Sequence, residues 1–255
     1  MRVALPQSFV NLPLAHRGLH DAAEGRIENA MASFHAAIAA GYGIELDIQL
    51  SADGQAMSFH DDTLDRLTSE VGAVRARTAA ELGAIRLKGS NDTIPTFRRV
   101  LEAVAGRVPL LVEIKDQDGA FGAGVGPLEE AVARDLRDYA GDCAVMSFNP
   151  FSVEAMQALL PDVPRGITTD AFEPLPAGVS PEAAKSLRGI EAYDRVGASF
   201  ISHDREDLDR PRVAELKAAG ARVLCWTVRS AEEEAEARKV AENITFEGYL
   251  PDKTA

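Results

Sequence analysis

Eight short apolar segments recur along the 255-residue chain, and helix-like stretches separate most of them. Several segments are continuous apolar runs, such as residues 108–112, which is typical of parallel strands covered on both faces. Strands that alternate with helices form parallel sheets, and eight such units close into a barrel. We therefore predict an α/β fold, a TIM (β/α)8 barrel, with strands near Leu14, Leu46, Leu111, Val145, Ile167, Ile201, Val223 and Thr245. The eighth outer helix is expected to be missing or vestigial, because little chain follows the last segment.

The chain between the second and third predicted strands departs from this alternation. Asp53-Gly54 is a tight-turn signal, so residues 55–59 should fold back along the second strand. Residues 61–92 have a poor apolar period apart from a short helical piece around residues 78–87. We interpret residues 51–92 as an insertion over the barrel mouth. No linker or repeat divides the chain, so residues 1–255 are predicted to form a single barrel domain.

The charge balance restricts the partners of the chain. Asp and Glu outnumber Lys and Arg by 40 to 27, which gives a formal net charge of −13. Nucleic acids and anionic membranes are usually bound through a basic stripe, so we expect neither as a partner. The expected partner is a small-molecule substrate, and the sequence leaves the oligomeric state open.

The sequence also carries expectations about location. No run approaches the roughly 20 apolar residues of a membrane span, and residues 1–10 lack the apolar core of a signal peptide. Cys143 and Cys225 lie in strand-like segments without metal-binding spacing, and we interpret them as reduced core residues. We therefore expect a cytoplasmic protein without a membrane span.

Two carboxylates stand on one face of the second predicted strand. Residues 43–50 alternate apolar and polar side chains, and Glu45 and Asp47 project to the same side. Neighbouring carboxylates in a buried site need an ion pair, a shared proton or a metal. Their hard oxygen atoms suit Mg²⁺, Ca²⁺ or Mn²⁺. A solvated outer face is the alternative, and the strand alone does not decide between the two.

Further charged residues follow other predicted strands. His16 and Arg17 follow the first strand, and Glu113 and Lys115 end the third, where their spacing of two puts them on one face. In a TIM barrel the active site lies at the carboxyl ends of the strands. The predicted barrel therefore places these residues and Glu45 together at the carboxyl end of the strands.

The chain carries the motifs His16-Arg17-Gly18, Glu28-Asn29, Glu45-Leu46-Asp47-Ile48-Gln49, His60-Asp61 with Thr63-Leu64-Asp65-Arg66-Leu67-Thr68, and Glu113-Ile114-Lys115. In order and spacing, over about the first half of the chain, these motifs resemble the glycerophosphodiester phosphodiesterase family. Weaker similarities follow at Ser147-Phe148-Asn149-Pro150 and Trp226-Thr227-Val228.

The resemblance and the residue chemistry together suggest roles. Metal-dependent hydrolysis of glycerophosphodiesters to glycerol 3-phosphate and an alcohol is expected, with Mg²⁺ or Ca²⁺ as cofactor and Mn²⁺ as a further candidate. We expect the metal ligands to be Glu45, Asp47 and Glu113, the acid–base pair to be His16 and His60, and the substrate-binding residues to be Arg17, Lys115 and Trp226. Either the substrate's own glycerol hydroxyl or water could be the nucleophile. His60 is preferred as the general acid.

Alternatives remain open from the sequence. A metal-dependent barrel lyase or isomerase could use the same carboxylates, and a non-catalytic relative could bind phosphate. Asn29 could be only a helix N-cap, Trp226 only a core indole, and His203 only a loop residue. The chain departs from the usual family pattern at Ile27, at Ala30 and in the last strand, where Glu247 follows Phe246 instead of a Thr-Asp pair.

Overall fold

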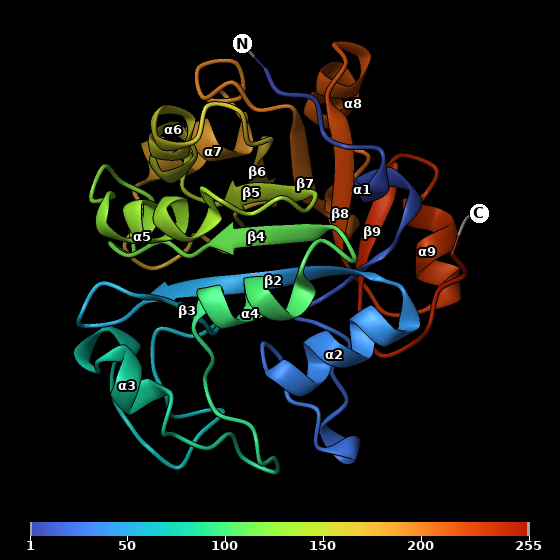
Figure 1. Cartoon of the computed structure of the whole chain (residues 1–255). Coiled ribbons are helices and arrows are strands. Elements are labelled where there is room, and N and C mark those ends of the chain that lie inside the picture. Colours follow the sequence, from blue (N-terminus) through green and yellow to red (C-terminus); the bar gives the residue numbers. More distant parts are fainter. Residues whose placement is uncertain (1, 254–255) are drawn as a thin grey trace.

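The computed structural model describes residues 2–253 and shows eight parallel strands closed into a barrel (Figure 1). Strand β1 pairs in parallel with both β2 and β9, which closes the sheet and confirms the predicted TIM barrel. The barrel strands are β1 (Leu14–Ala15), β2 (Gly43–Leu50), β4 (Leu110–Ile114), β5 (Cys143–Ser147), β6 (Arg165–Thr169), β7 (Phe200–Asp204), β8 (Arg222–Val228) and β9 (Asn243–Phe246).

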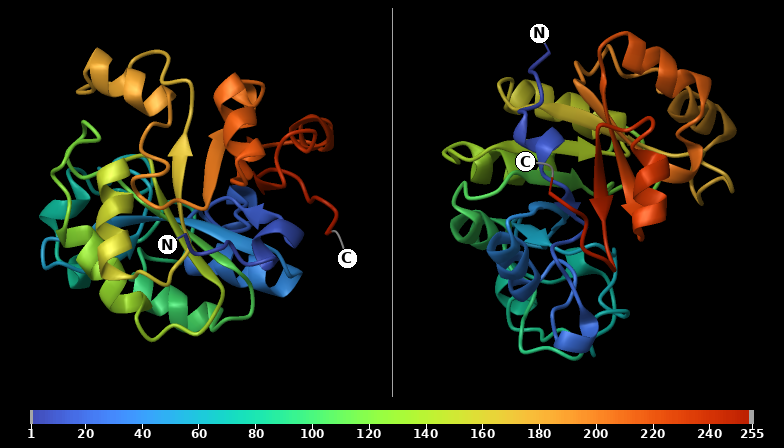
Figure 2. Two further views of the ribbon diagram at one scale, coloured as in Figure 1. Left: turned by 90° about the horizontal axis from the view of Figure 1, so that it is seen from above. Right: turned by 90° about the vertical axis from the view of Figure 1, so that its right-hand side faces the viewer.

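Helices connect consecutive barrel strands and surround them in the two further views of Figure 2. They are α2 (Met31–Ala40), α4 (Phe97–Val104), α5 (Pro127–Leu136), α6 (Pro150–Leu159), α7 (Pro181–Arg188), α8 (Pro211–Ala218) and α9 (Ala231–Ala237), and a short α1 (Ser8–Asn11) precedes β1. Side chains of Thr96, Asn149, Ser180 and Ser230 cap four of them by accepting backbone N–H groups. Residues 247–253 form no helix, as expected for the eighth unit. No helix within residues 2–253 has the length and apolarity needed to cross a bilayer.

The chain between β2 and α4 forms a separate layer beside the end of β2 (Figure 1). It contains β3 (Ala56–Ser58), which pairs antiparallel with β2 as the turn signal predicted, the 3-10 helix η2 (Val74–Ala76) and α3 (Ala79–Leu82). Residues of this layer form a buried cluster with Ile27 and Ala30 from the loop before α2; they are Met57, Phe59, Leu64, Val74, Leu82, Leu87 and Ile94. The packing holds the loop after β3 in place at the barrel mouth.

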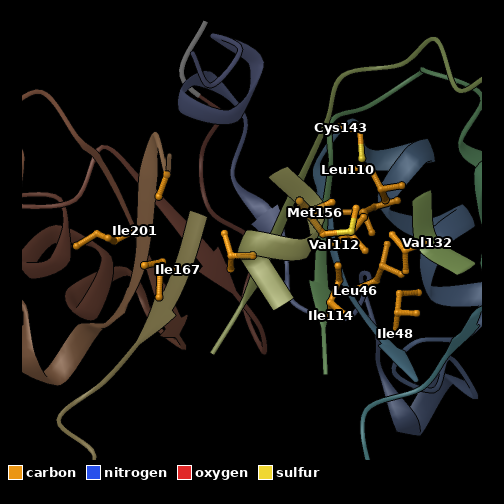
Figure 3. Close-up of a cluster of buried hydrophobic side chains, with 14 of the residues drawn as sticks. Leu46, Ile48, Leu110, Val112, Ile114, Val132, Cys143, Met156, Ile167 and Ile201 are labelled. Carbon is orange, nitrogen blue, oxygen red and sulfur yellow. The ribbon is translucent and has the colours of Figure 1, made fainter. Parts of the chain in front are cut away.

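The two faces of the barrel strands have different surroundings. Leu46, Ile48 and Val112 point outward and pack against the surrounding helices, where Val132 of α5 and Met156 of α6 meet them (Figure 3). The opposite face points into the barrel. Its interior holds a second apolar cluster of Leu5, Phe9, Leu14, Leu111, Ala144, Met146, Phe200 and Leu224, to which α1 contributes Phe9.

Gly166 of β6 leaves the space that the Phe200 ring fills inside the barrel. A Cβ atom at Gly166 would lie 2.3 Å from a ring carbon of Phe200, and the Phe200 side chain is fully buried. Contacts this short force neighbouring atoms to move, and cores resist such movement.

We expect Gly166→Ala to lower the free energy of unfolding by about 1–3 kcal/mol through overpacking. Chemical denaturation monitored by circular dichroism measures this change. Because Phe200→Leu removes the clashing ring atoms, the double variant should be less destabilised than the sum of the two single variants. Unchanged stability of Gly166→Ala would contradict this packing.

Candidate active site

A cavity of about 180 Å³ lies at the carboxyl ends of the barrel strands. It is lined by all eight of the site residues predicted from the sequence: His16, Arg17, Glu45, Asp47, His60, Glu113, Lys115 and Trp226. Met146, Phe148, Thr227, Arg229 and Thr245 complete the lining. Residues from β2, β4, β8 and the two loops after β1 and β3 therefore meet in one place.

Three carboxylates form the floor of this cavity. Glu45 and Asp47 project inward from β2, and β4 places Glu113 directly opposite Asp47 in the parallel register. One oxygen atom of each residue lies within 4.8 Å of an oxygen of the other two. Their exposed fractions are 2%, 2% and 7%, so the alternative of a solvated outer face is excluded.

The close approach of the three acids perturbs their protonation. Burial, together with the negative charges of Asp47 and Glu113, raises the pKa of Glu45 well above its usual value. The N–H of Arg17 donates a hydrogen bond of 3.0 Å to Glu45 and only partly opposes this effect. The charge of the triad is therefore not fully compensated by the protein itself.

Two cations lie against the acids. The Lys115 ammonium donates to Glu113 at 2.7 Å and contacts Asp47 at 3.2 Å, while Nε of Arg17 lies 3.3 Å from Asp47. Burial alone would raise the pKa of Asp47, but Lys115 and the other nearby cations hold it well below its usual value. Lys115 and Arg17 thus line the cavity and also belong to the ion network of the acids.

Asn29 fixes the orientation of Asp47 and does not cap α2. Its Nδ2 donates to Asp47 Oδ2 at 2.8 Å, and its Oδ1 accepts the Asp47 backbone N–H at 3.1 Å. The N-cap of α2 is Ala30, which offers no side-chain cap. Arg17 and Asn29 both have a positive φ of 55°, a conformation that costs non-glycine residues energy and is concentrated at functional sites.

His16 is held by a carboxylate from the end of β9. Its Nδ1 lies 2.6 Å from Glu247 Oε2, and Arg229 binds the other Glu247 oxygen at 2.8 Å. Hydrogen bonds from His16 and His20 hold the pKa of Glu247 well below its usual value. Burial lowers the pKa of His16, while the bond to Glu247 acts in the opposite direction.

His60 lies in the loop after β3, and a series of alternating acidic and basic side chains holds it in place. Its Nδ1 lies 2.7 Å from Asp61 Oδ1, and Arg66 binds both oxygens of Asp61 at 2.7 and 2.9 Å. Arg66 also binds both oxygens of Glu28, which accepts a further bond of 2.6 Å from Arg17. The loop that carries His60 is thereby connected to the loop that carries Arg17.

Two other residues considered from the sequence, Trp226 and His203, have different locations. Trp226 lines the cavity, and its indole N–H donates to the Ser202 carbonyl at 3.0 Å. His203 is 1% exposed, bonds Thr169 and contacts Asp207, and lies outside the cavity lining. It is therefore a structural residue of the β7 end.

Three residues that support the site were assigned no role from the sequence. Asp61 and Arg66 were visible only as part of a motif, and the assignment of Glu247 was open. The signal available for Asp61 was its position next to His60, since a carboxylate that follows an acid–base histidine is placed to orient it. For Glu247 the signal was its place at the end of the eighth strand, where side chains face the mouth.

The donor set fits a hard divalent cation. Three buried carboxylate oxygens lie close together, and among residues 2–253 the Lys and Arg side chains in contact with them are Lys115 and Arg17. Burial and the mutual repulsion of the acids raise the pKa of Glu45. Oxygen ligands of this kind match Mg²⁺, Ca²⁺ or Mn²⁺. Two histidines, each with Nδ1 held by a carboxylate, line the same cavity, an arrangement suited to acid–base chemistry on a bound anion.

Comparisons with known proteins point to one family. The family described as "Glycerophosphoryl diester phosphodiesterase family" matches residues 16–244. A Bacillus subtilis (strain 168) protein named "Putative glycerophosphodiester phosphodiesterase YhdW" is 29% identical over 226 residues, which cover 85% of this chain and 86% of the relative. A glycerophosphodiester phosphodiesterase of Caldanaerobacter subterraneus subsp. tengcongensis is 31% identical over 166 residues, which cover 61% of this chain and 65% of the relative.

Solved structures agree with the sequence comparisons. An Oleispira antarctica phosphodiesterase, determined in complex with the product sn-glycerol-3-phosphate, superposes with a TM-score of 0.76 and 25% identity, covering 94% of each chain. With a matching barrel, a family match over nearly the whole chain and relatives that carry the same enzyme name, this chain belongs to the glycerophosphodiester phosphodiesterase family.

Proposed function

We propose that this enzyme hydrolyses glycerophosphodiesters to glycerol 3-phosphate and an alcohol with the help of a divalent cation and two histidines. The observation that carries the proposal is the convergence of three buried carboxylates, two cationic side chains and two carboxylate-held histidines on one cavity. Phosphate oxygens need cations, and a departing alkoxide needs a proton.

The cation would be held by Glu45, Asp47 and Glu113, with Mg²⁺ or Ca²⁺ preferred and Mn²⁺ as a further candidate. When bound, it would supply Lewis-acid polarisation of a phosphate oxygen. Arg17 and Lys115 would neutralise the negative charge that accumulates on the phosphate oxygens in the transition state. Trp226 would form one wall against the substrate.

The histidines have opposite roles in this proposal. Burial lowers the pKa of His16, which favours the neutral imidazole that a general base needs. His16 would take the proton of the attacking hydroxyl, either that of the substrate's glycerol or that of water. His60, beside Asp61, would give a proton to the departing alkoxide. Because Nδ1 of each ring is held by a carboxylate, Nε2 is the nitrogen that would exchange the proton.

We also propose that residues 1–255 act as a single domain with residues 51–92 as the insertion, and that the protein is cytoplasmic. Cys143 and Cys225 are both buried free thiols, which suits a reducing compartment. Detection of the protein in a periplasmic or secreted fraction would contradict this location.

A panel of glycerophosphodiesters tests the proposed activity. With added Mg²⁺, Ca²⁺ or Mn²⁺ we expect release of glycerol 3-phosphate, and EDTA should abolish the release until excess metal restores it, because the acids require a cation to organise the phosphate. Enzyme-coupled detection of glycerol 3-phosphate is the measurement. Turnover that survives EDTA would disprove the metal requirement, and binding of the diester without turnover would indicate a non-catalytic relative.

Two single variants separate the acid from the metal ligands. We expect His60→Ala to lower kcat by about 10²–10⁴-fold while metal binding is retained, because only proton transfer is lost. Glu45→Ala should lose both turnover and metal binding. Calorimetric metal titration together with single-turnover kinetics measures both properties. Wild-type activity in either variant would refute the role given to that residue.

The pH profile tests the assignment of His16. Glu247 raises the pKa of His16, so Glu247→Gln should lower that pKa further. A general base is active when neutral, and therefore the acidic limb of the kcat/KM profile should move to lower pH in the variant. Glu102→Gln, an exposed residue of α4, makes the same charge change and should leave the limb in place. A shift of only the alkaline limb would mean that His16 is the acid.

A further inference from the structure

Three side chains that can bind a metal lie together outside the carboxylate triad. His16, His20 and Glu247 each place one ligand atom, a ring nitrogen or a carboxylate oxygen, within 4.8 Å of the ligand atoms of the other two. We call these three residues the histidine cluster. Their side chains are 14%, 25% and 20% exposed, so the cluster is shielded by the protein but still reached by solvent. Of the three, His16 alone lines the catalytic cavity, and the proposed function gives His20 no part.

The backbone brings the histidine cluster together from both ends of the chain. Parallel pairing of β1 with β9 places the residues that follow these strands, His16 and Glu247, side by side. The loop after β1 turns at Gly18, where φ is 81°, and the His20 N–H donates to the Gly18 carbonyl at 2.9 Å. A Cβ atom at Gly18 would lie 2.5 Å from Ser33 Oγ, so this position needs glycine. The tight turn returns His20 to Glu247.

His20 has a ring nitrogen without a strong partner. Its Nε2 is buried and has no well-formed hydrogen bond within residues 2–253. It lies 3.5 Å from Glu247 Oε2, at the outer limit of hydrogen bonding, and the same oxygen lies 2.6 Å from His16 Nδ1. A buried polar atom left in this state costs free energy, and unmodified native structures usually satisfy it with a water or an ion. The three ligand atoms thus meet around one carboxylate oxygen.

Two imidazole nitrogens and a carboxylate oxygen are a donor set for a transition metal. Imidazole suits Zn²⁺, Cu²⁺ and Ni²⁺, whereas Mg²⁺ and Ca²⁺ prefer oxygen ligands alone. Ligand atoms about 2.0–2.2 Å from zinc lie roughly 3.3 Å from one another in a tetrahedron. The separation of 3.5 Å between His20 and Glu247 already matches this spacing, and the His16–Glu247 contact has to lengthen. Three protein ligands leave the fourth position to water.

Arg229 orients the carboxylate of the cluster. Its Nε donates to Glu247 Oε1 at 2.8 Å, while Oε2 faces the two histidines. Carboxylates that bind metals are commonly held by a further hydrogen bond of this kind. The Arg229 side chain is 55% exposed, so water and salt screen its repulsion of a cation. Glu247 therefore keeps one oriented oxygen for a metal.

We propose that His16, His20 and Glu247 form a second metal site, which binds Zn²⁺ or a similar transition-metal ion, and that its occupation inhibits the enzyme. The inhibition rests on the proposed function, in which His16 Nε2 takes the proton of the attacking hydroxyl. Zinc takes the lone pair of His16 Nδ1, so the ring proton moves from Nδ1 to Nε2 through solvent and the imidazole stays neutral. A protonated Nε2 accepts no further proton, and the general base is lost.

Calorimetry of the Mg²⁺-saturated protein tests the site, because excess Mg²⁺ occupies the carboxylate triad. We expect titration with zinc chloride to show one zinc ion per chain, and His20→Ala to weaken its binding by at least about tenfold, since a ligand is lost. His35→Ala removes an exposed histidine of α2 and should bind zinc as the wild type does. His20→Gln gives the same readout if His20→Ala does not fold. No zinc binding by the wild type, or equal affinity in the His20 variants, would overturn the site.

Co²⁺ provides a spectroscopic probe of the same site. A four-coordinate Co²⁺ ion with nitrogen ligands absorbs visible light much more strongly than a six-coordinate ion held by oxygen atoms. With excess Mg²⁺ present, we expect Co²⁺ to give strong visible bands in the wild type, which Zn²⁺ removes, and none in His20→Ala. Strong bands that persist in His20→Ala would place the ion elsewhere and overturn the site.

Turnover of a glycerophosphodiester tests the inhibition. At saturating Mg²⁺, zinc at several times its dissociation constant should lower kcat of the wild type by at least about tenfold, as loss of a general base would. His20→Ala should need at least about tenfold more zinc for half-inhibition, and His35→Ala the same amount as the wild type. Equal zinc sensitivity of His20→Ala, or zinc that binds without slowing turnover, would overturn the inhibition. No turnover of any diester before zinc is added would instead overturn the proposed function, while calorimetry and the Co²⁺ spectrum still test the site.

Discussion

Three acidic side chains brought together inside a barrel are the constraint on which the site depends. Parallel pairing of β2 with β4 places Asp47 opposite Glu113, and the strand period adds Glu45 to the same face. Ionised carboxylates at this distance repel each other in a buried site. Three neighbouring side chains offset this repulsion, because Lys115, Arg17 and Asn29 all contact Asp47.

Ion pairs and hydrogen bonds between charged side chains also hold the two histidines. Arg17 connects Asp47 to Glu28, and Arg66 connects Glu28 to Asp61 and so to His60. His16 is held separately by the carboxylate of Glu247 at the end of β9. Each histidine is therefore oriented by its own carboxylate: Asp61 directly follows His60, whereas Glu247 is distant from His16 in the sequence.

The sequence predicted the barrel and the shared face of the carboxylates through local periodicity, whereas the other cavity-lining residues were predicted from their chemistry and from the resemblance to the family. The period of two in residues 43–50 required Glu45 and Asp47 to share a face, and the strand count required closure. The layer of residues 51–92 was less predictable, because its helix is only Ala79–Leu82 and its packing depends on contacts distant in sequence.

The contacts that support the site could not be obtained from periodicity. Asn29 looked equally like a helix cap, and only the structure shows that it bonds Asp47 while Ala30 occupies the cap position. The contact of Glu247 with His16 joins residues 231 positions apart, which the parallel pairing of β1 with β9 brings together. His203 had the expected place at a strand end, but its ring is turned into the scaffold.

Infrared spectroscopy of the metal-free protein tests the central claim most directly. Burial, together with the negative charges of Asp47 and Glu113, raises the pKa of Glu45 well above its usual value, so in a pH titration a protonated carboxyl band that is absent in Glu45→Gln should persist to higher pH than the band of an exposed glutamate. Addition of Ca²⁺ or Mg²⁺ should remove this band, because a metal ligand is deprotonated. A spectrum without such a band, or a band unchanged by either cation, would contradict the account of the site as a cation-binding triad.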